Sequence, residues 1–252
     1  SSLNTAATIS AFSGRRWKPS LLVCLSAMVH GAAAVAAIVS PQVWVWVLAT
    51  LLLNHAVLVA LTLCPRGTWL GPNLVRLPAA ATRRGEICLT FDDGPDPLLT
   101  PRVLDLLDRF QAKASFFCIG RKAAAFPELV KEIVRRGHSV ENHSHRHRHT
   151  FAFFGLAHLR SEIETAQTTL AAITGRAPRF FRAPAGFRSL LLDPVLASLS
   201  LHYVSWTRRG FDAVSRSPQR VLRRLTRELA AGDVLLLHDN ASVVLEVLPA
   251  LL

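Results

Sequence analysis

The chain is 252 residues long and is both basic and hydrophobic, since 29 Lys and Arg oppose 17 Asp and Glu, and half of its residues are hydrophobic. A net charge of +12 with a mean hydropathy of +0.30 excludes an intrinsically disordered chain. Four cysteines are too few for a small disulfide-stapled scaffold. The length is sufficient to bury a hydrophobic core.

In the first part of the chain, a long uncharged hydrophobic stretch lies between two groups of basic residues. Residues 1–85 contain no Asp or Glu, and no charged residue lies between Lys18 and Arg66. Because about 20 apolar residues cross a bilayer and Pro41 disfavours one continuous helix, we predict two transmembrane helices, near 20–39 and 43–64. Residues 1–65 then form a membrane region. A cleaved signal peptide followed by a buried core helix is the alternative, but a signal peptide has a shorter apolar region.

Basic residues flank both predicted spans. The positive-inside rule therefore favours a multi-pass protein of a bacterial-type inner membrane, with the downstream domain on the cytoplasmic side. This topology explains the excess of positive charge without a nucleic-acid partner, and the sequence has no nucleic-acid-binding motif. The basic residues concerned are Arg15, Arg16, Lys18, Arg66, Arg76, Arg83 and Arg84.

Residues 66–85 are predicted to form a linker, and residues 86–252 to form one domain. Short apolar, β-prone runs alternate there with segments of helical periodicity, which predicts a parallel sheet or barrel of the α/β class. The predicted strands are Glu86–Phe91, Ala114–Ile119, Ser139–Asn142, Arg179–Phe181, Leu201–Trp206 and Asp233–Leu237. The predicted helices are Pro101–Phe110, Pro127–Arg136, Leu159–Thr174, Pro194–Leu199 and Pro218–Ala231.

Polar residues follow the predicted strands at the point where each strand ends. In α/β proteins this edge of the sheet carries the active site. The recurrence at five strands therefore predicts one site built from all of them. The residues are Asp92 and Asp93, the histidines from His143 to His147, Arg182, Trp206, and His238 with Asp239.

Two of these clusters have the composition of a metal site. One carboxylate and two imidazoles leave room for water on a catalytic metal, and His143 and His147 face one metal if their segment turns helically. A plain turn is the alternative for Asp92-Asp93-Gly94-Pro95. A solvated tract is the alternative for the histidines, which alternate with arginines.

Five motifs together resemble the polysaccharide deacetylase family, whose domain is also called the NodB homology domain or carbohydrate esterase family 4. The resemblance covers about residues 86–252. It implies a distorted (β/α) barrel that removes acetyl groups from N-acetylated sugars with a divalent metal, zinc or cobalt. The motifs are Thr90-Phe91-Asp92-Asp93-Gly94-Pro95, His143-Ser144-His145-Arg146-His147, Arg182-Ala183-Pro184-Ala185-Gly186, the segment from Trp206 to Asp212, and Leu236-Leu237-His238.

The resemblance also implies roles for individual residues. Asp93, His143 and His147 are expected to hold the metal, and Asp92 to be the base that deprotonates the metal-bound water. His238 is expected to protonate the departing amine, with Arg182 orienting Asp92 and Asp212 tuning His238. The residues expected to contact the substrate are Pro184, Gly186, Trp206 and Leu236.

The sequence departs from the family at three places. Ala185 and Ala213 stand where the family usually carries large aromatic residues. We therefore expect a wider or flatter sugar groove that binds a polymer less tightly. The family also commonly continues beyond the position of Leu252, so either the domain is C-terminally truncated or its barrel is closed differently. The chain begins with Ser rather than Met, which favours a fragment, so we expect the truncated domain.

Three functions are consistent with these patterns. The first is a membrane-anchored deacetylase of an amino-sugar glycan or a lipid-linked sugar. The second is a deformylase or other N-deacylase on a lipid-carried sugar, and the third is a catalytically silent carbohydrate-binding membrane module. The complete set of expected catalytic residues argues against the silent module.

Overall fold

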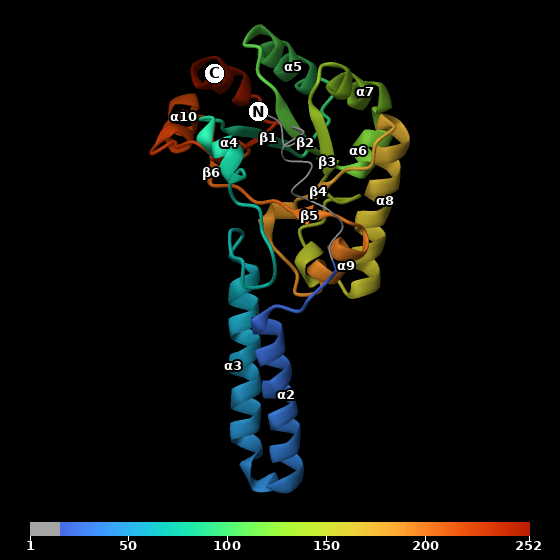
Figure 1. Ribbon diagram of the computed structural model, residues 1–252, viewed down its shortest axis with the longest axis vertical. Coiled ribbons are helices and arrows are strands. Elements are labelled where there is room, and N and C mark those ends of the chain that lie inside the picture. Colours follow the sequence, from blue (N-terminus) through green and yellow to red (C-terminus); the bar gives the residue numbers. More distant parts are fainter. Residues whose placement is uncertain (1–15) are drawn as a thin grey trace.

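The computed structural model describes residues 16–252, so Arg15 lies outside the described residues. A hairpin of two long helices projects from an α/β domain (Figure 1). The hairpin consists of α2 (Leu21–Val39), the short η1 (Pro41–Val43) and α3 (Trp44–Thr62). The predicted interruption at Pro41 is therefore the turn between the two helices.

The hairpin helices are long and apolar enough to cross a membrane. Most of their side chains are exposed, with Ala33 buried in α2 and Leu58 and Thr62 buried in α3. One hydrogen bond joins the two helices, from Asn54 Nδ2 to Ser26 Oγ at 3.0 Å. So much exposed apolar surface distinguishes these helices from the core helices of a water-soluble domain.

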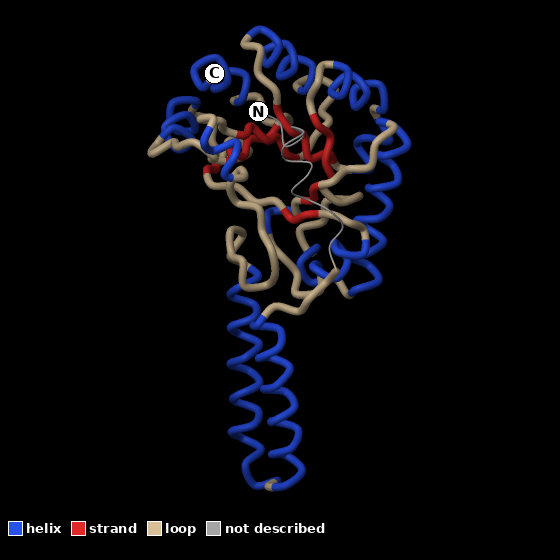
Figure 2. The backbone as a smooth tube through the Cα atoms, in the orientation of Figure 1, coloured by secondary structure: helices blue, strands red, loops and turns tan. Residues whose placement is uncertain are grey.

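The domain is built on a curled parallel sheet of seven strands, which forms an open half-barrel (Figure 2). The strand order is β5-β4-β3-β2-β1-β7-β6, and every paired neighbour is parallel. The expected α/β architecture with a barrel-like parallel sheet is confirmed. The strands are β1 (Cys88–Asp92), β2 (Ala114–Cys118), β3 (Ser139–Asn142), β4 (Phe180–Phe181), β5 (His202–Tyr203), β6 (Arg208–Arg209) and β7 (Val234–His238).

Helices cover the outer face of the sheet (Figure 1). Most of them pack with the apolar sides of β1, β2 and β7 around a core of Leu, Val, Ile and Phe. Ala81 of α4 packs instead in a second cluster with Phe117, Trp206 and Leu236, and α9 packs in a third. The helices are α4 (Ala79–Arg83), α5 (Thr100–Arg109), α6 (Gly120–Ala125), α7 (Pro127–Arg135), α8 (Leu156–Thr174), α9 (Leu192–Ser198), α10 (Pro218–Thr226) and α11 (Val244–Leu251), with 3-10 turns η2 (Phe151–Phe153) and η3 (Pro184–Gly186).

The segment expected to be a linker contacts both sides of the opening in the half-barrel. Leu74 forms a parallel bridge to Val204 just after β5, and Arg76 forms an antiparallel bridge to Asp233 just before β7. Arg76 also donates a 2.6 Å hydrogen bond to the buried Asp233 carboxylate. Residues 74–77 therefore link the β5 edge of the sheet to the start of β7.

Several elements differ from the sequence-based expectation. The expected strand at Leu201–Trp206 is limited to His202 and Tyr203, because the backbone then turns to pair with Leu74. The helix expected to reach Ala231 ends at Thr226, since Glu228 has a positive φ of 53° and Asp233 accepts a hydrogen bond from the Ala230 amide. The elements α4, α6, α11 and β6 were not predicted.

A buried carboxyl group on β3 holds the start of β4. Glu141 Oε2 accepts hydrogen bonds from the backbone amides of Arg179 and Phe180, at 3.0 and 2.9 Å. Burial raises the pKa of Glu141 to about 7, although these two amides oppose the shift. Because β4 leads directly to Arg182, this carboxyl group helps to place the functional edge.

We predict that Glu141 makes stability depend on pH. Its folded-state pKa lies above its unfolded value, so its contribution is complete below about pH 4.5 and is lost as the pH rises through about 7. Between pH 5 and pH 8 the native protein should lose about 1–3 kcal/mol of unfolding free energy that Glu141→Gln does not lose. Denaturant titrations at both pH values in detergent measure this difference. The exposed Glu164→Gln is the matched control, and parallel losses in all three proteins would contradict the prediction.

Candidate active site

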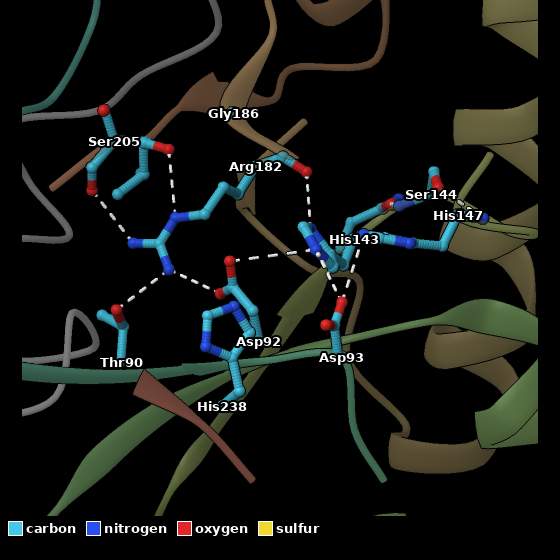
Figure 3. A network of polar contacts seen from close by, with 12 residues as sticks. Thr90, Asp92, Asp93, His143, Ser144, His147, Arg182, Gly186, Ser205 and His238 are labelled. Atoms are coloured by element: carbon cyan, nitrogen blue, oxygen red, sulfur yellow. Dashed lines mark hydrogen bonds and ion pairs between the residues drawn. The ribbon is translucent and has the colours of Figure 1, made fainter. Parts of the chain in front are cut away.

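The carboxyl ends of four strands bring the expected residues together (Figure 3). Asp92 is the last residue of β1 and His238 is the last residue of β7, and the two are partners in the strand register. His143 follows β3 directly, and Arg182 follows β4 directly. Side chains up to 146 residues apart in the sequence therefore meet because parallel strands end at one edge.

A tight turn directs Asp93 away from the strand. Asp93 has a φ of 72°, and Lys122 Nζ donates a 2.7 Å hydrogen bond to its carbonyl oxygen. A Cβ atom at Gly94 would lie 2.2 Å from the Asp239 carboxylate, so only glycine fits at this position. The Asp-Gly sequence therefore does form a turn, and the turn serves to present the Asp93 carboxylate to the histidines.

Asp93, His143 and His147 form a cluster suited to a metal ion. Their ligand atoms all lie within 4.8 Å of one another. Asp93 Oδ1 is 3.4 Å from His143 Nε2 and 3.1 Å from His147 Nε2, and it is buried yet accepts no well-formed hydrogen bond from the described residues. A carboxylate oxygen with two imidazole nitrogens is a donor set that Zn²⁺ and related ions prefer. The cluster therefore fits the expected divalent metal.

A backbone acceptor fixes the orientation of His143. Its Nδ1 atom donates to the carbonyl oxygen of Arg182 at 2.8 Å, which leaves Nε2 facing Asp93. Metal-binding histidines commonly donate their second ring nitrogen in this way, which sets the tautomer. His143 is therefore held with its Nε2 lone pair available to a metal ion.

His143 and His147 meet on an irregular loop, so the helical turn considered for their spacing is wrong. Ser144 and His147 have positive φ values of 61° and 53°, and these turn the backbone back on itself. Ser144 stabilises the loop, because its amide donates to Asn142 Oδ1 and its hydroxyl accepts from the His147 amide. The two imidazole centroids are consequently 4.7 Å apart.

The electrostatics of the cluster favour an ionised Asp93 carboxylate beside a neutral His147 imidazole. Burial acts to raise the pKa of Asp93, but the imidazoles of His143 and His147 outweigh it and hold that pKa below the ordinary value. Burial and the nearby His143 lower the pKa of His147 to about 4. These two shifts keep Asp93 and His147 free of protons near neutral pH. Burial acts to lower the pKa of His143, but the carboxylates of Asp92 and Asp93 outweigh it and raise that pKa.

Arg182 holds Asp92 in a fully buried ion pair. Its Nη1 donates to Asp92 Oδ1 at 2.5 Å and to Thr90 Oγ1 at 2.9 Å. Its other nitrogens donate to the backbone oxygens of Val204 and Ser205, and its guanidinium lies 4.1 Å from the centroid of the Phe117 ring. With one oxygen bound to Arg182, Asp92 directs Oδ2 toward His143, whose Nε2 is 3.8 Å away.

His238 is paired with Asp212 on the opposite side of the cluster. Asp212 Oδ1 lies 3.0 Å from His238 Nδ1, and Asp212 Oδ2 accepts the His238 amide at 2.7 Å. Burial acts to lower the pKa of His238, but the Asp212 carboxylate outweighs it and raises that pKa. His238 therefore tends to carry a proton, as a general acid must.

These groups surround a cleft with a volume of about 140 Å³. Trp206, Gly186 and Leu236, which the resemblance implied would contact the substrate, all line this cleft. A Cβ atom at Gly186 would lie 2.3 Å from the Trp206 ring, so glycine allows the indole to approach. Pro184 is buried in η3 just before this wall. Ala185 and Ala213 also line the cleft, so neither position supplies an aromatic wall.

Two residues of the cleft were not identified from the sequence. His149 and Arg209 both line it. His149 belongs to the His/Arg tract, where nothing in the sequence distinguishes it from its neighbours. Arg209 lies on β6, a two-residue strand too short to produce a periodic pattern.

The sequence model of the polysaccharide deacetylase family matches residues 79–204. Among curated relatives, a peptidoglycan-N-acetylglucosamine deacetylase from Bacillus cereus is 38% identical over 181 residues, which are 69% of this chain and 65% of that protein. A chitooligosaccharide deacetylase from Bradyrhizobium sp. is 33% identical over 173 residues, which are 65% of this chain and 78% of that protein. The chain belongs to the polysaccharide deacetylase family.

A solved structure gives the same relationship. The family 4 carbohydrate esterase from Streptomyces lividans, in complex with acetate, aligns with a TM-score of 0.63 and 34% identity. The alignment covers 66% of this chain and 85% of that one. The half-barrel fold and the family membership therefore agree, while the chain spans just under two thirds of the length of the Bacillus cereus relative.

We predict that removing a ligand from the cluster weakens metal binding. Loss of one imidazole in His147→Ala should weaken the affinity for Zn²⁺ at least tenfold, because two protein ligands remain of three. Calorimetric titration of the full chain in detergent measures the affinity. The matched control is His158→Ala, whose ring stacks on Phe154 outside the cluster. Equal Zn²⁺ affinities in native and His147→Ala protein would contradict the assignment.

Proposed function

We propose that this chain is a membrane-anchored, metal-dependent hydrolase that removes N-acetyl groups from an amino-sugar glycan or a lipid-linked sugar. The observation that carries the proposal is one cleft that joins three elements. These are the Asp93, His143 and His147 cluster, the Asp92–Arg182 pair and the His238–Asp212 pair. Amide hydrolysis needs a polarised carbonyl, a base for water and an acid for the leaving amine, and each element supplies one of these.

The ligand cluster is proposed to hold the metal through Asp93 Oδ1 and the Nε2 atoms of His143 and His147. A divalent ion there would act as a Lewis acid on the acetyl oxygen and lower the pKa of water. The residues around it have separate tasks. The His143–Arg182 hydrogen bond keeps one ligand in the correct tautomer.

Asp92 is proposed as the base that accepts the proton of the attacking water. Arg182 neutralises one of its oxygens, which leaves Oδ2 directed toward the ligand cluster. The fully buried guanidinium also prevents rotation of the carboxylate, because Thr90 and two backbone oxygens fix it in turn. A base held within reach of its proton contributes typically 10²–10⁴-fold to the rate.

His238 is proposed as the acid that protonates the departing amine. Nδ1 is engaged by Asp212, so Nε2 remains to deliver the proton. An amine leaves poorly without a proton, so this step requires His238 to be charged at the working pH. The raised pKa of His238, due to Asp212, supports that requirement.

The hairpin is proposed to anchor the domain with its cleft beside the membrane. Thr62 at the end of α3 accepts a 3.3 Å hydrogen bond from the Arg188 amide, and Arg66 donates to Thr207 O at 3.3 Å. Pro65 lies 3.1 Å from the position of a Cβ atom at Gly186, which lines the cleft. This proximity supports a substrate at the membrane surface, and the basic residues near Arg16 and Arg66 support the cytoplasmic side.

We predict that Asp92→Asn retains the metal and loses activity. The amide is almost isosteric but accepts no proton, so kcat should fall by at least 10²-fold, while Zn²⁺ affinity changes little. Release of free amines from N-acetylglucosamine oligomers and from a lipid-linked N-acetylated sugar measures the rate.

The control for this test is Asp96→Asn, which alters a half-buried carboxylate that lies outside the cleft and accepts the Leu98 and Leu99 amides. A chelator should abolish activity in the native protein, and added Zn²⁺ should restore it. Full activity in Asp92→Asn, or in the presence of chelator, would refute the reaction class. Release of formate from N-formylated sugars but not of acetate would instead favour the deformylase alternative.

We predict that a reporter fused after Leu252 is active only in the cytoplasm, and that the chain stays in the membrane fraction after alkaline extraction. The reason is the basic charge on both sides of the two apolar helices. Release by alkali would exclude the anchor. Activity of a reporter that requires export would reverse the topology and make an exported polymer the substrate.

A further inference from the structure

Arg209 is the one cation in the cleft that has no anionic partner among the residues described. The carboxylates around the cleft are already engaged, since Asp92 contacts Arg182, Asp93 contacts the histidines, and Asp212 contacts His238. The described part of the chain gives Arg209 no salt bridge, and its Nε is buried without a hydrogen-bond acceptor. A buried donor that lacks an acceptor is costly unless a ligand supplies one.

The pleat of β6 explains why Arg209 differs from its neighbour. Successive side chains of a strand point to opposite faces. Arg208 points away from the cleft and forms a 3.1 Å ion pair with Asp233, while Arg209 points into the cleft beside Leu236. The two arginines therefore have different surroundings, and only Arg208 has an ion-pair partner among the described residues of the domain.

Aromatic rings hold the guanidinium of Arg209 in place. Its Cζ lies 5.3 Å from the centroid of the Trp206 ring and 4.7 Å from that of Phe211. Such contacts restrict the side chain without using its N–H groups, which stay available to a ligand. A fixed planar guanidinium matches two oxygens of a phosphate or a carboxylate.

From these contacts, and building on the proposed deacetylase function, we infer that Arg209 binds an anionic group of the substrate close to the acetamido group. Arg209 lines the same small cleft as Asp92 and His238, so the anion must lie within about one sugar ring of the amide that is cleaved. In N-acetylglucosamine the acetamido group is on C2. A phosphate on C1 and an acidic ether on C3 are each on an adjacent carbon, and both satisfy this requirement.

The experiment compares three N-acetylated tetrasaccharides in the metal-loaded full chain. One is neutral, one carries a phosphate on C1 of its reducing sugar, and one contains N-acetylmuramic acid with its carboxylate. The quantity measured is kcat/KM for each anionic substrate divided by kcat/KM for the neutral one. In Arg209→Gln this ratio should fall about 10- to 100-fold for at least one anionic substrate, because one charge-assisted hydrogen-bond pair is lost. The loss should reside mainly in KM.

Two variants separate binding from a structural role. Arg224→Gln changes a cation that also lies over Phe211, at 5.1 Å, but does not line the cleft, and it should leave the ratio unchanged. Arg209→Lys keeps the charge and should restore the ratio in part. In equilibrium binding measurements, the deacetylated anionic products should bind native protein and Arg224→Gln most tightly, Arg209→Lys less tightly and Arg209→Gln least tightly.

The outcomes are distinct. Loss with the phosphate substrate alone identifies a sugar phosphate, and loss with the carboxylate substrate alone identifies a muramic acid. An equal loss of kcat/KM on all three substrates, or no change of the ratio, overturns the inference. Absence of amine release from every substrate by the native protein would instead overturn the proposed function.

Discussion

The buried guanidinium of Arg182 is the interaction on which the site depends. It connects the ends of β1 and β4 with the turn after β5, because Asp92, Thr90 and two backbone oxygens all accept its hydrogen bonds. The backbone carbonyl oxygen of Arg182 also orients His143. Removing one partner of a buried ion pair typically costs about 3–5 kcal/mol. Burying this charge is therefore tolerable only with the Asp92 carboxylate beside it, and the same pairing gives the proposed base its orientation.

The sequence predicts much of the sheet and the position of the site, for physical reasons. Apolar β-prone runs such as Asp233–Leu237 are buried on both faces, so composition alone reveals them. Polar residues at strand ends cannot be part of that core, and parallel pairing then brings them to one edge. The pairings of residues 74–77 with the sheet could not be predicted. Leu74 and Arg76 contact residues more than 120 positions away, and nothing in their local sequence encodes those partners.

The same limit applies inside the site. The spacing of His143 and His147 indicates a pair, but their loop is closed by positive φ angles and a Ser144 hydroxyl, which a helical periodicity cannot anticipate. Arg209 looks like any other residue of a basic stretch until the pleat of β6 separates it from Arg208. Residue types therefore indicate the chemistry of the site. Only the three-dimensional structure shows which charged side chains have an opposite charge beside them and which do not.

The segment of residues 74–77 connects the helical hairpin to the half-barrel and also pairs with the sheet, so it limits how the two can move relative to each other. From α3 the chain runs past Gly186, pairs beside β5 and then forms an ion pair with Asp233. If the hairpin lies in a bilayer, the catalytic edge is then held at a fixed height above it. The cleft would then act only on sugars at that distance from the bilayer surface. The pairing of residues 74–77 with the sheet, and not the length of a flexible linker, would set this distance.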